Sequence, residues 1–240
     1  MPDQNWLTPI QEVAEGWSAE EVVDWSLSRF RRKIAIASAF GPEGIVLIDI
    51  ALRIRKDVQI FTLDTGLFFP ETYRLIDEVE RRYQIRIERV KPDLTIEEQA
   101  ARHGDALWTR SPDHCCSMRK IEPLRRKLAT LDAWATAIRR DQTPERSQAK
   151  KVEWDNKFGL IKVNPLCDWT NEMVWDYVRE HGLPYNPLHD CGYPSIGCQP
   201  CTSTVRSGEN PRSGRWSGLA KTECGLHQRP SSNELRVLGD

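Results

Sequence analysis

Short apolar runs alternate with longer amphipathic segments along most of the chain. The runs of strand length lie at residues 33–39, 58–64, 85–90 and 133–138. The segments with helical spacing lie at residues 19–30, 45–55, 70–83, 95–103, 119–128 and 170–182. Strands that alternate with helices predict an α/β fold, in which a mostly parallel sheet carries helices on both faces.

Several of these segments carry residues that start or stop a helix. Ser18 followed by Glu21 forms a capping box before the segment at 19–30. Pro70 stands at the first turn of its segment, where a missing N–H costs nothing. Thr170 is a capping residue for the last helical segment, and Gly182 is its stop signal. These signals support the predicted helices independently of hydrophobic spacing.

Two loops follow the first two predicted strands. They are SAFGPEG at residues 38–44 and DTGLFF at residues 64–69. In parallel α/β sheets, ligands bind at the loops that leave the carboxyl ends of the strands. We therefore expect the functional site at these two loops.

Regular patterning weakens toward the C-terminus. Beyond residue 182, Pro, Gly, Ser and Arg dominate with little periodicity, so this part of the chain needs something besides a hydrophobic core to order it. We expect an N-terminal helical segment at 1–32, an α/β unit at 33–205 and an Arg-rich, irregular C-terminal segment at 206–240.

Composition and charge narrow the class of protein. The 240 residues are 39% hydrophobic, which suffices for an ordinary core, and 34 Lys and Arg nearly balance 35 Asp and Glu. This balance predicts neither a nucleic-acid nor a membrane partner, so any anion site must be local. The N-terminus has no features of a secretory signal. Seven cysteines are too few for a disulfide scaffold of this length, and we infer a reducing, cytoplasmic setting.

Four of the cysteines fall into two close pairs. Cys115 and Cys116 are adjacent, whereas Cys198 and Cys201 form a C-x-x-C after a glycine. Four thiolates suit zinc or an iron-sulfur cluster. A zinc ion is normally bound by two C-x-x-C motifs. Two adjacent cysteines bind more easily to two different iron atoms, so the spacing favours a 4Fe-4S cluster. Four reduced, buried cysteines remain the alternative.

Cys224 lies near the C-terminus, apart from those four. A thiolate attacks best when nearby cations lower its pKa, and Lys221, His227 and the arginines of the PRSGRW stretch are candidate neighbours. An incidental tail cysteine is the competing interpretation. Cys167 and Cys191 have no motif partner, and we assign them no role.

Basic residues recur at positions that a fold could bring together. Arginine clamps phosphate and sulfate with paired donors, and lysine adds a compact charge. Either several of these residues converge on one anion or they form solvated surface. The positions are Arg119, Lys120, Arg139, Arg140, Arg146, Arg212 and Arg215.

Read together, these motifs resemble the assimilatory adenylyl-sulfate and phosphoadenylyl-sulfate reductase family. The resemblance runs from about residue 34 to residue 227 and is carried by SAFGPEG, LDTG, FPETY, CCSMRKIEPL, RRDQ, YNPLHDCGYPSIGCQPCT, PRSGRW and ECGLH. It implies an adenine nucleotide alpha hydrolase-like fold with a modified phosphate loop at 38–44. This loop lacks the Ser-Gly-Gly-x-Asp-Ser form of related ATP pyrophosphatases, which argues against adenylating chemistry with ATP.

The resemblance also implies a cofactor, a substrate and a reductant. Members with both cysteine pairs carry one 4Fe-4S cluster and generally reduce adenosine 5′-phosphosulfate (APS), with thioredoxin or a glutaredoxin-like protein as partner. The implied ligands are Cys115, Cys116, Cys198 and Cys201. Cys224 in ECGLH is implied as the catalytic cysteine, carried by a mobile C-terminal lid.

The substrate-binding residues are implied in the same way. They are Lys120, Arg146, Arg212 and Arg215 for the phosphosulfate, Ser38 in the phosphate loop, and the backbone of Leu63 and Ala137. Ala137 replaces the glycine usual in the family, and its methyl group crowds a close backbone approach. Two alternatives stay open, a reductase of 3′-phosphoadenosine 5′-phosphosulfate (PAPS) and a nonenzymatic iron-sulfur or nucleotide sensor. The sequence leaves a homo-oligomer open.

Overall fold

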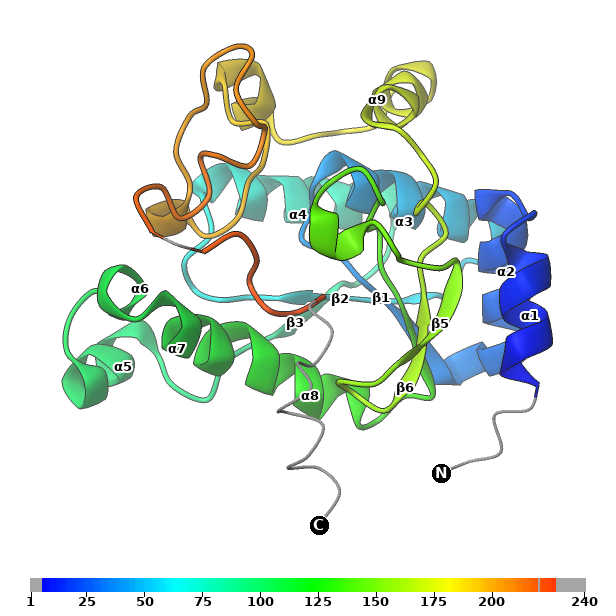
Figure 1. The fold of residues 1–240 in the computed structure, drawn as a ribbon, viewed down its shortest axis with the longest axis horizontal. Helices are drawn as coiled ribbons and strands as arrows, with labels where there is room; N and C mark the ends of the chain where they lie inside the picture. Colours follow the sequence, from blue (N-terminus) through cyan, green and yellow to red (C-terminus); the bar gives the residue numbers. More distant parts are fainter. Residues whose placement is uncertain (1–5, 220, 228–240) are drawn as a thin grey trace.

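A six-stranded sheet forms the centre of the computed structural model, which describes residues 6–219 and 221–227 (Figure 1). The strand order is β3-β2-β1-β4-β6-β5. The strands are β1 (Ile34–Ala37), β2 (Gln59–Leu63), β3 (Glu88–Val90), β4 (Ala133–Ala135), β5 (Val152–Asp155) and β6 (Leu160–Val163). Every neighbouring pair is parallel except β5 and β6, so the prediction of a mostly parallel sheet is confirmed.

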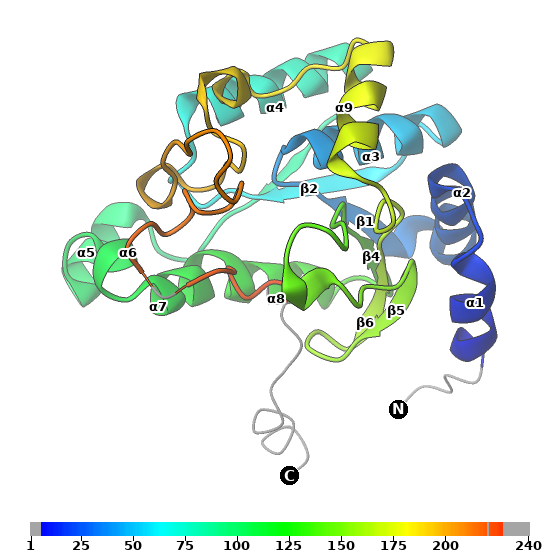
Figure 2. The ribbon, with the colours of Figure 1, turned by 45° about the horizontal axis from the view of Figure 1, so that its top comes forward.

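Helices cover both faces of this sheet (Figures 1 and 2). Helices α3, α4 and α9 lie over one face, and α5 to α8 lie on the opposite side, whereas α1 and α2 pack at the β5 end. Their bounds are α1 (Leu7–Ala14), α2 (Ala19–Phe30), α3 (Pro42–Ile54), α4 (Pro70–Tyr83), α5 (Ile96–His103), α6 (Leu107–Arg110), α7 (Pro112–Cys116), α8 (Glu122–Leu128) and α9 (Asn171–Glu180).

The central strand β1 divides the core into two clusters. Successive side chains of a strand point to opposite faces of the sheet. Accordingly, Ile34 and Ile36 join the larger cluster beneath α3, α4 and α9, whereas Ala35 joins the smaller cluster with Leu124 and Leu128 of α8. Both faces are therefore apolar, which explains why the strands appear in the sequence as continuous apolar runs.

Helix ends largely follow the predicted signals. The capping box of Ser18 and Glu21 forms at the start of α2, and Thr170 caps α9 by accepting a hydrogen bond from the backbone N–H of Met173. Pro70 begins α4. Helix α3 begins at Pro42, three residues before the predicted segment, and so takes in part of the SAFGPEG loop.

The sequence did not predict α6, α7, β5 and β6, and it predicted α1 only as part of the helical segment at 1–32. Helix α1 has no side-chain capping bond, so it lacks the usual start signal. Strands β5 and β6 have only four residues each, and their antiparallel pairing buries Lys162 against Glu153, with 3.5 Å between the ammonium and the carboxylate. A buried lysine interrupts the apolar pattern that marks the other strands.

Beyond α9 the chain has little regular structure, as expected. Two isolated bridges order this region, one between Phe68 and Cys198 and one between Thr202 and Arg215. Short 3₁₀ turns occur at Pro187–Cys191 and Gln199–Cys201. Among the described residues, no helix is both long and apolar enough to cross a bilayer.

Candidate active site

A cavity of about 970 Å³ opens at the carboxyl ends of β1, β2 and β4. Its apolar wall includes Phe61, Leu124 and Trp134. The cavity collects all the residues proposed from the sequence for substrate binding and nucleophilic attack, namely Ser38, Leu63, Lys120, Ala137, Arg146, Arg212, Arg215 and Cys224. Residues up to 186 positions apart in the chain thus line the same cavity.

The loop between β1 and α3 forms one side of the cavity. The Ser38 hydroxyl accepts a hydrogen bond from the backbone N–H of Phe40 at 3.1 Å, and Phe40 adopts a left-handed conformation with φ of 59°. A Cβ atom on Gly44 would lie 2.4 Å from Ser38 Oγ, so only glycine fits there. The first turn of α3 is thereby packed directly on the loop, and its residues Pro42, Glu43 and Gly44 line the cavity.

The backbone positions proposed for nucleotide contact lie at two strand ends. Leu63 is the last residue of β2, and Ala137 follows β4 by two residues. Both are half-buried and line the cavity. The Ala137 methyl group therefore stands at the cavity wall, where the sequence analysis expected it to crowd a ligand.

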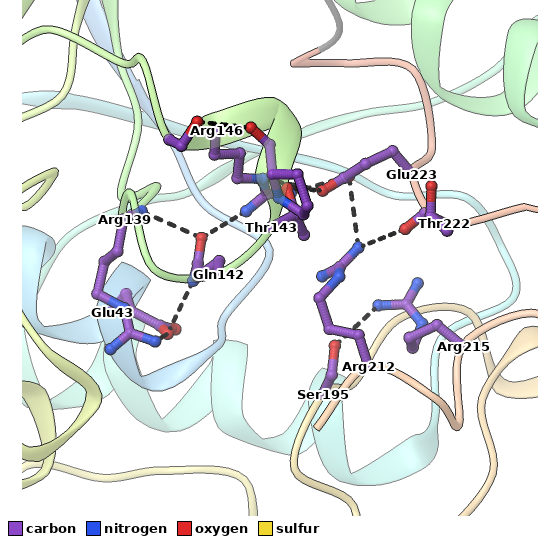
Figure 3. A network of polar contacts seen from close by, with 12 residues as sticks. Glu43, Arg139, Gln142, Thr143, Arg146, Ser195, Arg212, Arg215, Thr222 and Glu223 are labelled. Atoms are coloured by element: carbon purple, nitrogen blue, oxygen red, sulfur yellow. Dashed lines mark hydrogen bonds and ion pairs between the residues drawn. The ribbon is translucent and has the colours of Figure 1, made fainter. Parts of the chain in front are cut away.

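Arg146 is held in a buried ion-pair network (Figure 3). Its guanidinium makes a two-point contact with the Glu223 carboxylate, with Nε to Oε1 and NH2 to Oε2 both 3.0 Å. Its NH1 group donates to the side chain of Gln142 at 2.5 Å, and Gln142 in turn donates to Glu43 at 3.0 Å. Arg139 also pairs with Glu43, at 3.4 Å.

Arg212 and Arg215 approach the cavity from the Arg-rich loop (Figure 3). Arg212 donates to the carbonyl of Thr222 at 3.0 Å and lies 3.4 Å from Glu223. Arg215 donates to the Ser195 hydroxyl at 3.4 Å, and its guanidinium stacks on the indole ring of Trp216 with 4.7 Å to the ring centroid. The guanidinium of Arg215 therefore lies at the cavity wall without a carboxylate in either of these contacts.

Lys120 reaches the cavity because a π-helical turn, Ser117–Ile121, interrupts the helical run between α7 and α8. Such turns insert an extra residue and redirect side chains, often at functional sites. Burial lowers the pKa of Lys120, but nearby cysteine thiolates outweigh burial and raise this pKa above its ordinary value. The contributing thiolates are, in decreasing order, Cys198, Cys224 and Cys116. Lys120 thus interacts with charges from both cysteine pairs and from Cys224.

The two cysteine pairs come together beside this cavity. Cys115 and Cys116 end α7, while Cys198 and Cys201 flank the turn at Gln199–Cys201. Three of the thiols are buried, Cys201 is half-buried, and all four are free of disulfides. Burial raises the pKa of Cys201 to about 11, and the charge of Cys198 adds to this rise. Burial and the other thiolates likewise raise the pKa of Cys115 to about 11.

Polar groups surround the buried sulfur atoms. Thr65 Oγ1 lies 3.3 Å from Cys198 Sγ, and Gln99 Nε2 lies 3.9 Å from Cys115 Sγ. Arg119 is buried and donates to the carbonyl of Thr65 at 2.6 Å and to the side chain of Gln99 at 3.0 Å. The loop after β2 therefore supports the C-x-x-C turn, and its residue Phe68 also lines the cavity, at the loop where the functional site was expected.

The donor set of this thiol cluster consists of sulfur alone. Cysteine thiolates are the ligands of iron-sulfur clusters and of tetrahedral zinc. Within residues 6–219 and 221–227, no three His, Cys, Asp or Glu side chains lie close enough together to hold a single metal ion. The four thiols are therefore grouped in one region but are not drawn around a single point.

Cys224 is half-buried and faces the cavity. Its charge acts on Lys120 and Arg212, which places these two cations near the thiol. Lys221, a predicted neighbour, instead pairs with Asp113. His227 stacks on the Trp134 indole at 5.8 Å between ring centroids, and burial lowers its pKa well below the ordinary value.

Three polar residues of the site were missed by the sequence analysis. Glu43, Gln142 and Glu223 link the phosphate loop, the basic β4 loop and the tail through the network of Figure 3. Glu223 is inside the ECGLH motif, so its position beside Cys224 was the available signal. Glu43 lies in SAFGPEG and Gln142 ends RRDQ, so their place in these motifs was the available signal for them as well.

The fold and the cavity define an adenine nucleotide alpha hydrolase-like α/β protein with a thiol cluster beside its nucleotide-sized site. The family described as "Phosphoadenosine phosphosulfate reductase domain" matches residues 33–204. The chain belongs to this family, as its motifs predicted.

Relatives cover nearly the whole chain. A Bacillus subtilis protein named "Adenosine 5'-phosphosulfate reductase 1" is 50% identical over 228 residues, which are 93% of this chain and 98% of the relative. A Halalkalibacterium halodurans protein named "Adenosine 5'-phosphosulfate reductase" is 46% identical over 92% of this chain and 96% of its own. A Gloeobacter violaceus protein named "Phosphoadenosine 5'-phosphosulfate reductase" is 47% identical over 94% of this chain and 95% of its own.

Solved structures agree with the fold. The phosphate complex of phosphoadenylyl-sulfate reductase from Candida auris superposes with a TM-score of 0.74 at 32% identity, over 85% of this chain and 98% of that one. FMN adenylyltransferase from Candida glabrata superposes with a TM-score of 0.58 at 14% identity, over 99% of this chain and 82% of that one, and shares the fold alone.

Proposed function

We propose that this protein reduces APS to sulfite and AMP in sulfate assimilation, the route to cysteine. The observation that carries the proposal is one cavity that holds a phosphate-type loop, several cations and a cysteine. The names of the Bacillus subtilis and Halalkalibacterium halodurans relatives support APS as the substrate.

The first step is an attack by the Cys224 thiolate on the sulfur of the bound sulfate group. A Cys–S bond forms, and the bond between that sulfur and the bridging phosphate oxygen breaks. AMP leaves with the electron pair, and S-sulfocysteine remains on Cys224. Lys120 and Arg215 offset the repulsion between thiolate and substrate and stabilise charge on the departing phosphate.

The second step needs an external dithiol, for which thioredoxin or a glutaredoxin-like protein is the candidate. Its thiolate attacks Cys224 Sγ, the S–S bond to the sulfonate breaks, and sulfite leaves with the electron pair. A second donor thiol then resolves the mixed disulfide and regenerates the Cys224 thiol. The donor dithiol supplies both electrons.

These steps require the C-terminal segment to act as a lid. Cys224 must meet the nucleotide inside the cavity and afterwards face a protein partner, so residues 206–240 have to open between the half-reactions. Residues 220 and 228–240 of this segment lie outside the described part of the chain. The α/β unit at 33–205 stays in place while the lid moves, and the reducing chemistry fits a cytoplasmic setting.

The thiol cluster fits a 4Fe-4S group with Cys115, Cys116, Cys198 and Cys201 as ligands. All four donors are sulfur, and Arg119 is a buried cation beside them. A bound cluster would supply fixed charge beside the site. Lys120 would couple that charge to the cavity, because it lines the cavity and interacts with the charges of Cys198 and Cys116.

Intact-mass analysis tests this proposal. Anaerobically purified protein is mixed with APS without reductant, and a sulfonate adduct on Cys224 together with released AMP is the expected result. The Cys224→Ser variant is the control and should show neither product. Protein with a full complement of iron that forms no adduct would contradict the proposal.

The same assay with PAPS addresses the second candidate activity. The Gloeobacter violaceus and Candida auris proteins carry the PAPS reductase name, and this favours the second candidate. Faster adduct formation from PAPS than from APS would establish that substrate. Bound iron without an adduct from either nucleotide would identify a sensor.

A further inference from the structure

Glu223, the residue directly before Cys224, carries a carboxylate that is almost completely buried, with 1% of its side chain exposed. Buried carboxylates are found where cations and hydrogen-bond donors compensate for lost hydration. Here Arg146 supplies a two-point contact, with Nε to Oε1 and NH2 to Oε2 both 3.0 Å. The NH2 contact is a charge-assisted hydrogen bond, whereas the Nε contact is an ion pair without hydrogen-bond alignment.

Two further groups complete the surroundings of this carboxylate. The NH2 group of Arg212 lies 3.4 Å from Oε2, and the Thr143 hydroxyl donates to Oε1 at 3.3 Å. Arg212 also donates to the carbonyl of Thr222 at 3.0 Å, so it binds the backbone of the residue that precedes Glu223. The contacts thus come from two separate loops that converge on the tail.

The anchor continues into the rigid part of the fold (Figure 3). Arg146 donates to Gln142, and Gln142 donates to Glu43 in the first turn of α3. Gln142 also accepts a hydrogen bond from the backbone N–H of Arg139 at 3.1 Å. The tail is therefore connected by these contacts to α3, the helix that follows the loop at 38–44.

Two other cations of the cavity take no part in the contacts that hold Glu223. Arg215 contacts the hydroxyl of Ser195, and Lys120 lines the same cavity as Cys224. Arg146 and Arg212 are thus bound to the tail, whereas Arg215 and Lys120 line the volume where the substrate is expected.

We propose that Glu223 is the positioning residue for the Cys224 thiol. By pairing with Arg146 and Arg212, its carboxylate docks the tail on the cavity and presents Cys224 beside Lys120. The inference rests on the proposed role of Cys224 as nucleophile. Glu223 itself touches no reacting atom.

Alkylation of Cys224 by iodoacetamide tests the docking directly, without substrate. The anaerobic holoenzyme is labelled, and Cys224 is quantified by peptide mass spectrometry. Glu223→Asp keeps the charge beside the thiol but shortens the reach by one methylene, whereas Glu223→Gln removes the charge. We expect labelling about tenfold faster in both variants, as follows from losing a hydrogen bond to a charged group.

The matched control is Glu209→Gln, the same change at an exposed position of the Arg-rich loop, and it should label at the wild-type rate. Faster labelling in Glu223→Gln alone would show an effect of charge on the thiol pKa and would overturn the docking role. Wild-type rates in both Glu223 variants would overturn it as well. Thr143→Val, which removes only the hydroxyl donor, should raise the labelling rate less than either.

Single-turnover kinetics with APS separate this inference from the proposed function. In Glu223→Asp, we expect the rate of adduct formation to fall about tenfold while the dissociation constant for AMP stays unchanged, because a hydrogen-bonded anchor, and not a substrate contact, is lost. A weakened affinity for AMP with unchanged labelling would overturn the positioning role. Absence of any adduct in the wild type would count against the proposed function and leave the labelling result to stand on its own.

Discussion

Replacing Gly44 by alanine should disturb the phosphate loop through one identifiable contact. The new Cβ atom would lie 2.4 Å from Ser38 Oγ but 3.5 Å from Ser38 Cβ. The first distance is far below van der Waals contact, and the second is ordinary. The collision is therefore with the hydroxyl alone, and Ser38 has to rotate away from its hydrogen bond to the Phe40 N–H.

The size of the effect follows from opposing contributions. Inserting a methyl group into a packed site costs about 1–3 kcal/mol. Replacing glycine by alanine in a helix returns up to about 1 kcal/mol, and Gly44 lies in the first turn of α3. We expect Gly44→Ala to lower the free energy of unfolding by roughly 0–2 kcal/mol, the range left after about 1 kcal/mol is subtracted. Ser38→Ala alone leaves the Phe40 N–H unpaired, at a cost of about 1–3 kcal/mol.

The double variant distinguishes this explanation from a general loss of stability. Once Ser38→Ala has removed the hydroxyl, Gly44→Ala meets only an ordinary contact, and the two costs should fall short of additive by about 1–3 kcal/mol. Denaturant unfolding of the four proteins under anaerobic conditions measures this difference. Gly16→Ala, whose Cβ would lie 3.6 Å from the nearest atom, is the control. Additive costs would refute the reasoning.

Three further results are expected. Gly197→Ala should weaken binding of AMP at least severalfold in calorimetry, because its Cβ would lie 2.1 Å from an Arg215 nitrogen, and retained affinity would contradict that contact. Burial raises the pKa of Cys167 from 9.0 to about 12, so this thiol stabilises the fold below about pH 9, and this contribution is lost as the pH rises toward 12. Cys167→Ala should therefore reduce the fall in the free energy of unfolding at alkaline pH. An unchanged slope of that free energy against pH would exclude the thiol as its cause. Lys120→Met should depress adduct formation more than iron content, whereas equal losses would indicate a structural role.

The alternation of strands and helices was predictable because the core of this fold is apolar on both sides of the sheet. Strand β1 shows this in four residues, with Ile34 and Ile36 on one face and Ala35 on the other. Strands β5 and β6 escaped prediction for the opposite reason. Lys162 is buried there against Glu153, and a charge that is compensated only across two strands has no local signature.

The residues that line the cavity could be predicted wherever they lie in a recognisable motif. Every residue proposed for substrate binding lines the cavity, including the pair Arg212 and Arg215 from a stretch without secondary structure. Their contacts were not predictable, because they depend on distant partners. Arg146 illustrates the limit, since its guanidinium is occupied by Glu223, which lies 77 positions further along the chain.

The order of the chain also sets an order of assembly. The strands end at Val163 and the last helix at Glu180, so the sheet and its covering helices are complete before the Arg-rich loop has left the ribosome. Arg212, Arg215 and the tail then close over a surface that already exists. A nascent chain is therefore long enough to form the whole sheet before it contains the segment that carries Cys224.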